Sequence, residues 1–315
     1  MVDLTGAIGQ MVKLLVVVVL GFAAAKLGYL DRGMSSRLTK LLLNITMPCM
    51  ILASIDGLDA SEAGAQVPLA FALAFLMFAL LLATGLLCTT VLRVPATQVR
   101  EYLFMSACPN TGFIGLTVLS ALYGSESLLF GSIFTMVHSF LISTVALLII
   151  APEEEGGAKG HAPKIQWKTV ASPLTVACVL SIALFFAQVE LPGLAVETLD
   201  MVGGITSPLA LMLVGVMMAD VDFKSVLSEV RLYPYILIRQ LIVPVALYAL
   251  LSLAVDDTLL VGVFTIMFAM PVGTMVSLFV EQSGRDAELA AKGTILSTAA
   301  SFAAIPGLVT VMSLI

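Results

Sequence analysis

The fold of this chain is decided by two short stretches, Cys108-Pro109-Asn110-Thr111-Gly112 and Met270-Pro271-Val272-Gly273-Thr274. Each lies in the middle of an apolar segment that is long enough to cross a bilayer. The proline removes a backbone hydrogen bond and clashes with the preceding turn, and the glycine after it lets the backbone open. An opened helix at membrane depth persists only where protein, water or a ligand satisfies its backbone groups. One such break in each half of the chain is typical of a transporter's binding site.

The composition around the breaks predicts an all-α polytopic membrane protein. Of the 315 residues, 60% are hydrophobic and 11% are charged, whereas a soluble domain has about 25% charged residues. The net charge of −6 says little about partners, because the charges lie in short connections, but the sequence has no basic patch of the kind that binds nucleic acid. The four cysteines all lie in apolar segments without metal-ligand spacing. We therefore expect no metal site, no cofactor and no disulfide framework.

Ten stretches of the chain have the length and composition of a transmembrane helix. These predicted spans run near 9–30, 36–55, 67–91, 99–121, 126–149, 169–187, 195–219, 232–254, 258–281 and 288–313. The longest connection, 151–168, is polar and rich in Gly and Pro, which is typical of a flexible linker. It divides the chain into a first repeat of five helices (1–150) and a second (169–315). No cleavable signal pattern precedes the first span, so we expect that span to be retained.

The basic residues gather in alternate connections, and the connections between those hold only acids. Lys13 is the single exception among the fifteen Lys and Arg residues. Because cytoplasmic loops of membrane proteins are enriched in Lys and Arg, we expect both termini to face outward and the central linker to be cytoplasmic.

The two halves repeat in sequence. Asn44–Pro48 corresponds to 204–208, and Pro109 corresponds to Pro271, at offsets of 160 to 162 residues. Small and hydroxyl residues after the breaks also correspond: Gly131, Ser132, Ile133, Thr135, Ser139 and Phe140 match Gly293, Thr294, Ile295, Ser297, Ser301 and Phe302. Because five spans per repeat is an odd number, the second repeat enters the membrane upside down, as an inverted-topology repeat.

Unwinding at Pro109 and Pro271 would leave two half-helices whose N-terminal amides and positive dipole ends point at the centre of the membrane. Facing N-termini of this kind form an anion site without a fixed charge. We expect the two prolines to shape the site and Asn110 to be its main polar donor. The predicted substrate contacts are Pro109, Asn110, Thr111, Gly112, Pro271, Val272, Gly273 and Thr274. The alternative is that both breaks are ordinary proline kinks.

Other polar residues in the spans are candidates for the wall of the same cavity. These candidate residues are Asn44, Thr135, His138, Ser139, Ser297, Thr298 and Ser301. The serines and threonines form stripes on helix faces, which also suits close helix packing through small residues. For His138 we favour a neutral packing role, because its equivalent in the second repeat is Ala300. Arg239 could snorkel to the cytoplasmic surface, pair with an acid or attract an anion into the cytoplasmic vestibule, and of these we expect snorkelling.

No Asp or Glu lies near the centre of any predicted span. Proton-driven exchangers usually keep a carboxylate there, so coupling through a buried acid pair is not expected. The membrane potential alone contributes about 2.3 kcal/mol per charge per 100 mV, which is enough to drive uniport of an anion. A coupling cation held by carbonyl and hydroxyl oxygens is the alternative.

At the two breaks and the second span, the chain resembles the auxin efflux carrier family. That family includes plant auxin exporters and bacterial permeases of malate- or malonate-like acids. The matching features are 43–48, 109–115, Tyr123-Gly124 and Met270-Pro271, together with the short linker of bacterial members. The resemblance implies a fold shared with bile acid–sodium symporters. Helices 1, 2, 6 and 7 would form a scaffold, often dimeric, and helices 3–5 and 8–10 a moving transport domain with the crossed helices 4 and 9. It also implies that Asn110 matches the family's polar residue, whereas Val272 departs from the pattern.

The sequence therefore predicts a secondary transporter, in particular an efflux carrier, of a small organic anion such as a mono- or dicarboxylate. The resemblance implies an elevator mechanism in a plasma (bacterial inner) membrane, with substrate at the crossover and a homodimer formed through the scaffold. Na⁺ and H⁺ are the candidate coupling ions. The alternatives are a sodium-coupled symporter of a larger amphipathic anion and a non-transporting membrane sensor. An enzyme is not expected, because no span carries paired acids, an oriented Ser–His pair or a metal-ligand cluster.

Overall fold

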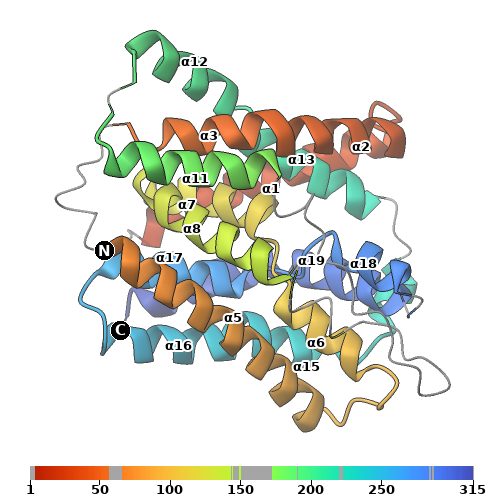
Figure 1. Ribbon diagram of the computed structural model, residues 1–315. Helices are drawn as coiled ribbons and strands as arrows, with labels where there is room; N and C mark the ends of the chain where they lie inside the picture. The colour runs from red at the N-terminus through yellow and green to blue at the C-terminus, as the bar shows by residue number, and fades with distance from the viewer. Residues whose placement is uncertain are drawn as a thin grey trace, which may run out of the picture.

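The computed structural model of the chain describes residues 4–56, 66–142, 144, 149, 172–189, 191–219, 223–283, 285 and 287–314. Across these residues the structure is mostly helical, and its one β-type pairing is an isolated bridge between Pro109 and Val272. The helices form a bundle in which the two ends of the chain lie at the same edge (Figure 1). The predicted linker 151–168 lies outside the described residues.

The helices of the first half follow the predicted apolar stretches. They are α1 (Leu4–Lys26), α2 (Arg32–Leu41), the π-helical turn η1 (Leu42–Thr46), α3 (Met47–Ala53), α5 (Gln66–Val91), α6 (Val99–Ala107), the π-helical turn η2 (Thr111–Leu116), α7 (Thr117–Tyr123) and α8 (Glu126–Leu141). The fourth stretch is thus divided between α6 and η2, where the proline predicts a break.

The second half shows the same correspondence. Its elements are α11 (Pro173–Phe186), α12 (Gly193–Gly203), α13 (Thr206–Ala219), α14 (Phe223–Leu227), α15 (Leu232–Leu237), the π-helical turn η4 (Ile238–Ile242), α16 (Val243–Ser252), α17 (Thr258–Ala269), α18 (Val276–Gln282) and α19 (Ala287–Met312). The ninth stretch is divided between α17 and α18, so both predicted breaks are present as interruptions of a helix.

Four of these helical stretches have the length and apolar composition to cross a membrane: Gln66–Val91, Gly193–Ala219, Leu232–Ser252 and Ala287–Met312. Shorter apolar helices lie at Thr111–Tyr123, Glu126–Leu141, Pro173–Phe186 and Thr258–Ala269. Two of the shorter helices adjoin the breaks, which explains their length. These features are those of a polytopic all-α membrane protein, and the count of ten spans stays a prediction.

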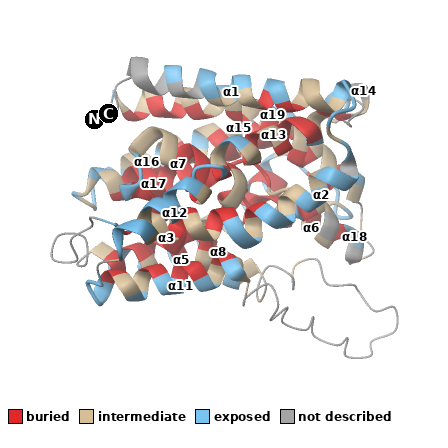
Figure 2. Cartoon of the chain, turned by 90° about the horizontal axis from the view of Figure 1, so that it is seen from above, coloured by how far each residue is buried: buried red, intermediate tan, exposed pale blue. Residues whose placement is uncertain are grey.

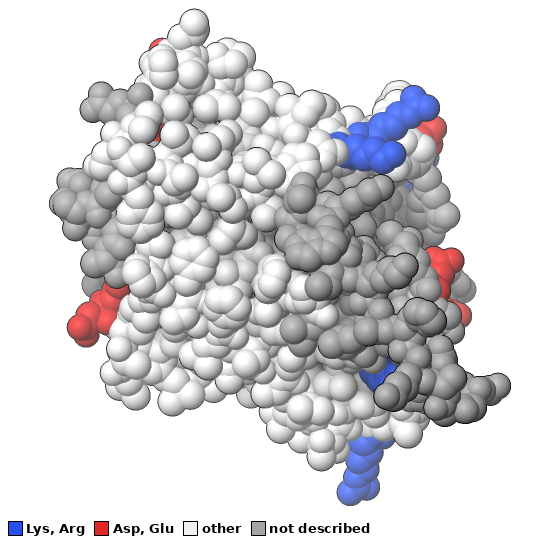
Figure 3. All heavy atoms as spheres, viewed as in Figure 1, with Lys and Arg blue, Asp and Glu red and all other residues white. Residues whose placement is uncertain are grey.

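The surface of the bundle separates charge from apolar side chains. Figure 3 shows charged side chains at the two ends of the bundle, whereas the described atoms of the face between them are uncharged. At the ends, polar caps begin the helices: Asp31 accepts from the Met34 amide (2.7 Å), and Asp257 accepts from the Leu260 amide (2.9 Å). Each cap satisfies one backbone donor that the first turn of a helix leaves free.

The helices pack most closely in two sets. In one set α1 packs along α13, and α3 packs against α11 and α12. In the other, α5 packs against α6 and α8, α17 against α8 and α16, and α18 against α19. Figure 2 shows that the buried residues line the inner faces of these helices, with exposed residues on the outer faces.

Glycines allow α1 and α13 to touch through their backbones. A Cβ added at Gly21 would overlap the carbonyl of Met212 and lie 2.6 Å from its Cα, and one added at Gly215 would overlap the carbonyl of Val18. Small residues give membrane helices this close approach, which gains van der Waals contact along the interface.

Replacing Gly21 by valine is therefore expected to force α1 away from α13. We expect a loss of about 3 kcal/mol of stability, the upper range for overpacking a tight contact. The measurement is the thermal unfolding midpoint of the purified protein in detergent. Gly9→Val on the same helix is the matched control, because a Cβ at Gly9 meets no atom within 4 Å. Equal losses in both variants would contradict the interpretation.

Candidate functional site

The two proline breaks lie against each other inside the bundle. The amide of Asn110 donates to the carbonyl of Pro271 (2.7 Å), and the amide of Gly273 donates to the carbonyl of Cys108 (2.7 Å). Together these bonds form an antiparallel bridge between Pro109 and Val272. The two broken segments therefore cross in opposite directions, and each uses the other to satisfy backbone groups that its own helix has lost.

The first break also frees the carbonyl of Ala107 at the end of α6. The Nε2 atom of His138, on α8, lies 2.7 Å from this oxygen, so that nitrogen carries the proton and donates. The histidine is buried, and its ring stacks on Phe134 with 5.8 Å between the ring centroids. These contacts are those of a packing residue, although His138 also reaches the cavity described below.

Arg239 does not snorkel to the surface, and that expectation is wrong. Its side chain is fully buried; Nη1 donates to the carbonyl of Met270 (2.6 Å), and Nη2 lies 3.4 Å from the carbonyl of Ser106. The neighbouring Gln240 reaches the carbonyl of Ala269 (3.5 Å). These carbonyls lie at the C-terminal ends of α6 and α17, where free oxygens and the negative end of the helix dipole offset the cost of burying a cation.

Side chains of α19 hold the second break. The Ser297 hydroxyl accepts from the amide of Val272 (3.0 Å), and the Thr294 hydroxyl lies 3.4 Å from the carbonyl of Gly273. The amides of Val272 and Gly273 are thus bonded within the protein. The sequence predicts that these amides point at an anion, whereas in the structure they bond to Ser297 and to Cys108 and stabilise the crossover.

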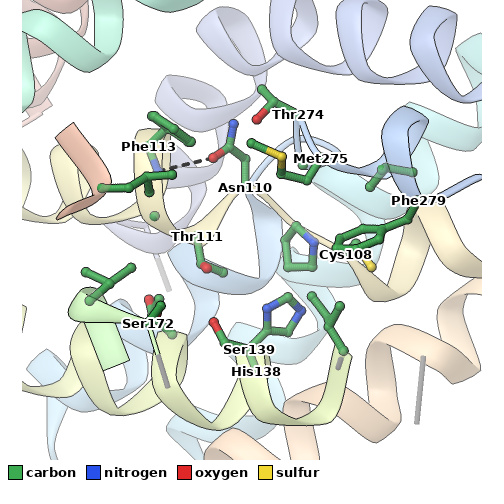
Figure 4. A pocket seen from close by; sticks show the side chains of 18 of the residues that line it. Cys108, Asn110, Thr111, Phe113, His138, Ser139, Ser172, Thr274, Met275 and Phe279 are labelled. Atoms are coloured by element: carbon green, nitrogen blue, oxygen red, sulfur yellow. Dashed lines mark hydrogen bonds between the residues drawn. The ribbon is translucent and has the colours of Figure 1, made fainter. Parts of the chain in front are cut away.

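A cavity of about 390 Å³ adjoins the crossover (Figure 4). The predicted residues that line it are Asn44, Pro109, Asn110, Thr111, Gly112, Thr135, His138, Ser139, Gly273 and Thr274. The predicted residues that do not line it are Pro271, Val272, Ser297, Thr298 and Ser301. The hydroxyls of Thr298 and Ser301 instead donate to carbonyls of their own helix, at 2.7 Å in both cases.

Asn110 lines this cavity and carries an unused donor. Its Oδ1 accepts from the amide of Phe113 (3.2 Å), which caps η2 and fixes which way the amide group faces. Its Nδ2 has no hydrogen-bond partner among the described residues, although the side chain is only 4% exposed. Figure 4 shows this nitrogen on the side of Thr274, across the cavity from Ser139 and Ser172. A buried donor without a partner costs free energy, which an acceptor on a ligand would recover.

The prediction from sequence missed several residues of the cavity wall. Among the described residues, Lys40 is the one charged residue that lines it, and Ser172, Phe113, Met275 and Phe279 contribute as well. Lys40 could have been found from its spacing, because it lies one helical turn before Asn44, whose amide donates to its carbonyl (2.7 Å). The described lining holds a lysine and the unused donor of Asn110 but no carboxylate, and this combination suits an anion.

Comparison with known protein families gives a match over most of the chain. Residues 7–309 match a family model described as a membrane transport protein. A comparison with curated proteins finds no match. The matched range contains both proline breaks and every residue that lines the cavity.

Proposed function

The chain belongs to the auxin efflux carrier family of membrane transport proteins, which are transporters rather than enzymes, and from this premise we propose that it is a secondary transporter of a small organic anion. The observation that carries the proposal is the cavity at the crossover. Among the residues that the structure describes, it combines a buried amide donor without a partner, on Asn110, with one charged side chain, that of Lys40.

The proposed substrate is a mono- or dicarboxylate. A volume of about 390 Å³ lies at the small end of ligand sites and suits a small acid. In this proposal one carboxylate accepts from Asn110 and from the hydroxyls of Thr111 and Thr274. Lys40 supplies long-range attraction to the anion at the mouth of the cavity. Pro109, Gly112 and Gly273 shape the wall.

The proposed transport step is an elevator-like shift of one set of helices against the other. The set of α1, α2, α3 and α11–α13 would be the scaffold and the dimer-forming part, and the set of α5–α8 and α15–α19 would carry the crossover. The packing described above supports this division, because the closest helix contacts lie within each set. The domain boundaries and the homodimer are part of the proposal.

The proposed orientation places both termini outside a bacterial inner membrane. The distribution of Lys and Arg supports it. In that orientation Ser172 caps the cytoplasmic end of α11, and Lys40 lies about two turns from the cytoplasmic start of α2, so the cavity of this structure reaches toward the cytoplasm. Such a state would receive an anion from inside, as an efflux carrier requires.

The test is a flux assay with the purified chain in proteoliposomes. We expect saturable uptake of at least one acid from a panel of radiolabelled monocarboxylates and dicarboxylates that includes malonate, malate and indole-3-acetate. The rate of uptake should increase when the imposed membrane potential makes the liposome interior positive, because a positive interior attracts an anion. Uptake no greater than in protein-free liposomes for every acid would contradict the proposal.

A further inference from the structure

Arg239 is a buried cation that the proposed mechanism has not used. Its side chain has no exposed surface, and no Asp or Glu forms an ion pair with it among the residues that the structure describes. It sits in the π-helical turn η4, and such turns are frequent at functional sites. A buried guanidinium without a carboxylate partner is rare in a membrane protein and marks function by default.

The contacts of Arg239 place it between the two halves of the crossover. One donor goes to the carbonyl of Met270, after α17, and another approaches the carbonyl of Ser106, near the end of α6. These two helices are separated in sequence, belong to opposite repeats and end at the same antiparallel bridge. The guanidinium is thus held by the C-terminal ends of both broken helices at once.

In transporters built from broken helices, unwound carbonyls and the C-terminal ends of half-helices are the groups that coordinate the coupling cation. We propose that the Arg239 guanidinium is a tethered cation that takes the place of a coupling ion at this crossover, so that the protein moves its anion without a co-transported cation. The claim that no cation is co-transported rests on the proposed function. The claim that the crossover needs a cation for stability is independent of it.

Two further observations fit a built-in cation. The spans carry no Asp or Glu near their centres, so a mobile cation beside Arg239 would meet repulsion without a compensating carboxylate. The Nε atom of Arg239 has no partner among the described residues, so the side chain is held by its charge and by two carbonyls rather than by a full set of hydrogen bonds.

The first test measures thermal unfolding of the purified full chain in detergent, with and without millimolar guanidinium chloride. We expect Arg239→Ala to lower the midpoint by roughly 5 °C, because two buried carbonyls lose a charged donor. Guanidinium should restore a large part of this loss and should leave the wild type unchanged. Arg231→Ala is the matched control, because Arg231 lies eight positions earlier and is exposed. An equal effect of guanidinium on all three proteins would overturn the proposal.

Two further variants keep the test decisive if Arg239→Ala does not fold. Arg239→Lys keeps a charge and should stay closer to the wild type than Arg239→Met, which keeps length without charge. Equal stability of the methionine and lysine variants would overturn the proposal.

The second test uses wild-type protein in proteoliposomes with radiolabelled malonate as the probe. At a clamped potential, we expect the same uptake in sodium, potassium and N-methylglucamine buffers, and no accumulation driven by a sodium or proton gradient at zero potential. Accumulation driven by either gradient would overturn the proposal. Absence of uptake for every acid in the panel would contradict the proposed function instead, and the thermal comparison then decides the role of Arg239.

Discussion

Replacing Asn110 by aspartate is expected to abolish uptake of the organic anion while the protein remains folded. The aspartate keeps an oxygen that can cap the amide of Phe113, as Oδ1 of Asn110 does at 3.2 Å. It also places a carboxylate at the start of a half-helix, where negative charge is tolerated. However, it replaces the unused donor by an acceptor that repels the substrate. Loss of a hydrogen bond to a charged group corresponds to about a hundredfold decrease in uptake at low substrate concentration.

The matched control is Asn44→Asp, which adds the same charge to the same cavity. The side chain of Asn44 is exposed and its amide is already bonded to the carbonyl of Lys40. Solvent screening should therefore limit its effect to less than about tenfold. Flux is measured in proteoliposomes, and unfolding midpoints show that both variants are folded. Equal losses would indicate a general charge effect, and undiminished uptake in Asn110→Asp would remove Asn110 from the site.

The positions of the breaks could be predicted because a local rule decides them. Proline ends or bends a helix wherever it occurs, and lipid does not change that. Accordingly α6 ends at Ala107 and α17 ends at Ala269, directly before the two predicted stretches. The matching residues of the two halves further predict that the two breaks are equivalent. Their antiparallel bridge brings them together as that equivalence suggests.

The partners of the breaks could not be predicted, because they come from distant parts of the chain. Arg239 bonds to residues 31 and 133 positions away, and Ser297 bonds to a residue 25 positions away. Helix periodicity shows which side chains share a face but not which neighbour that face meets. The sequence predicts a surface position for Arg239 because a long basic side chain near a helix end usually snorkels. The carbonyls that hold it inside are free only where the two helices have broken.

The same limit explains the serines and threonines of α19. In sequence they match those of α8 and gave equal support to a cavity wall and to packing. In the structure Thr135 and Ser139 line the cavity, whereas Ser297 holds the second break. The two breaks therefore differ in chemistry: Asn110 keeps a donor that no described residue uses, whereas the amides of Val272 and Gly273 are bonded within the protein.

A disulfide between a cysteine at position 132 and the native Cys178 is expected to stop uptake completely. Ser132 lies on α8, in the proposed moving set, and Cys178 lies on α11, in the proposed scaffold. Both side chains are fully buried, and the thiol of Cys178 is within hydrogen-bonding reach of the Ser132 hydroxyl. An elevator-like shift must slide α8 past α11, which a covalent bond between facing side chains forbids. The measurement is uptake by Ser132→Cys after oxidation with copper phenanthroline and again after reduction with dithiothreitol.

The control is the double variant Ser132→Cys with Cys178→Ser, which has the same new thiol without its partner. The remaining cysteines, Cys49, Cys88 and Cys108, are free in both proteins, so any effect they have on oxidation is shared. Arrest that appears only in the single variant and reverses on reduction requires relative motion of α8 and α11 during transport. Full uptake by cross-linked protein would show that α8 and α11 move together. The proposed division would then be wrong, because α11 and the crossover would belong to the same moving set.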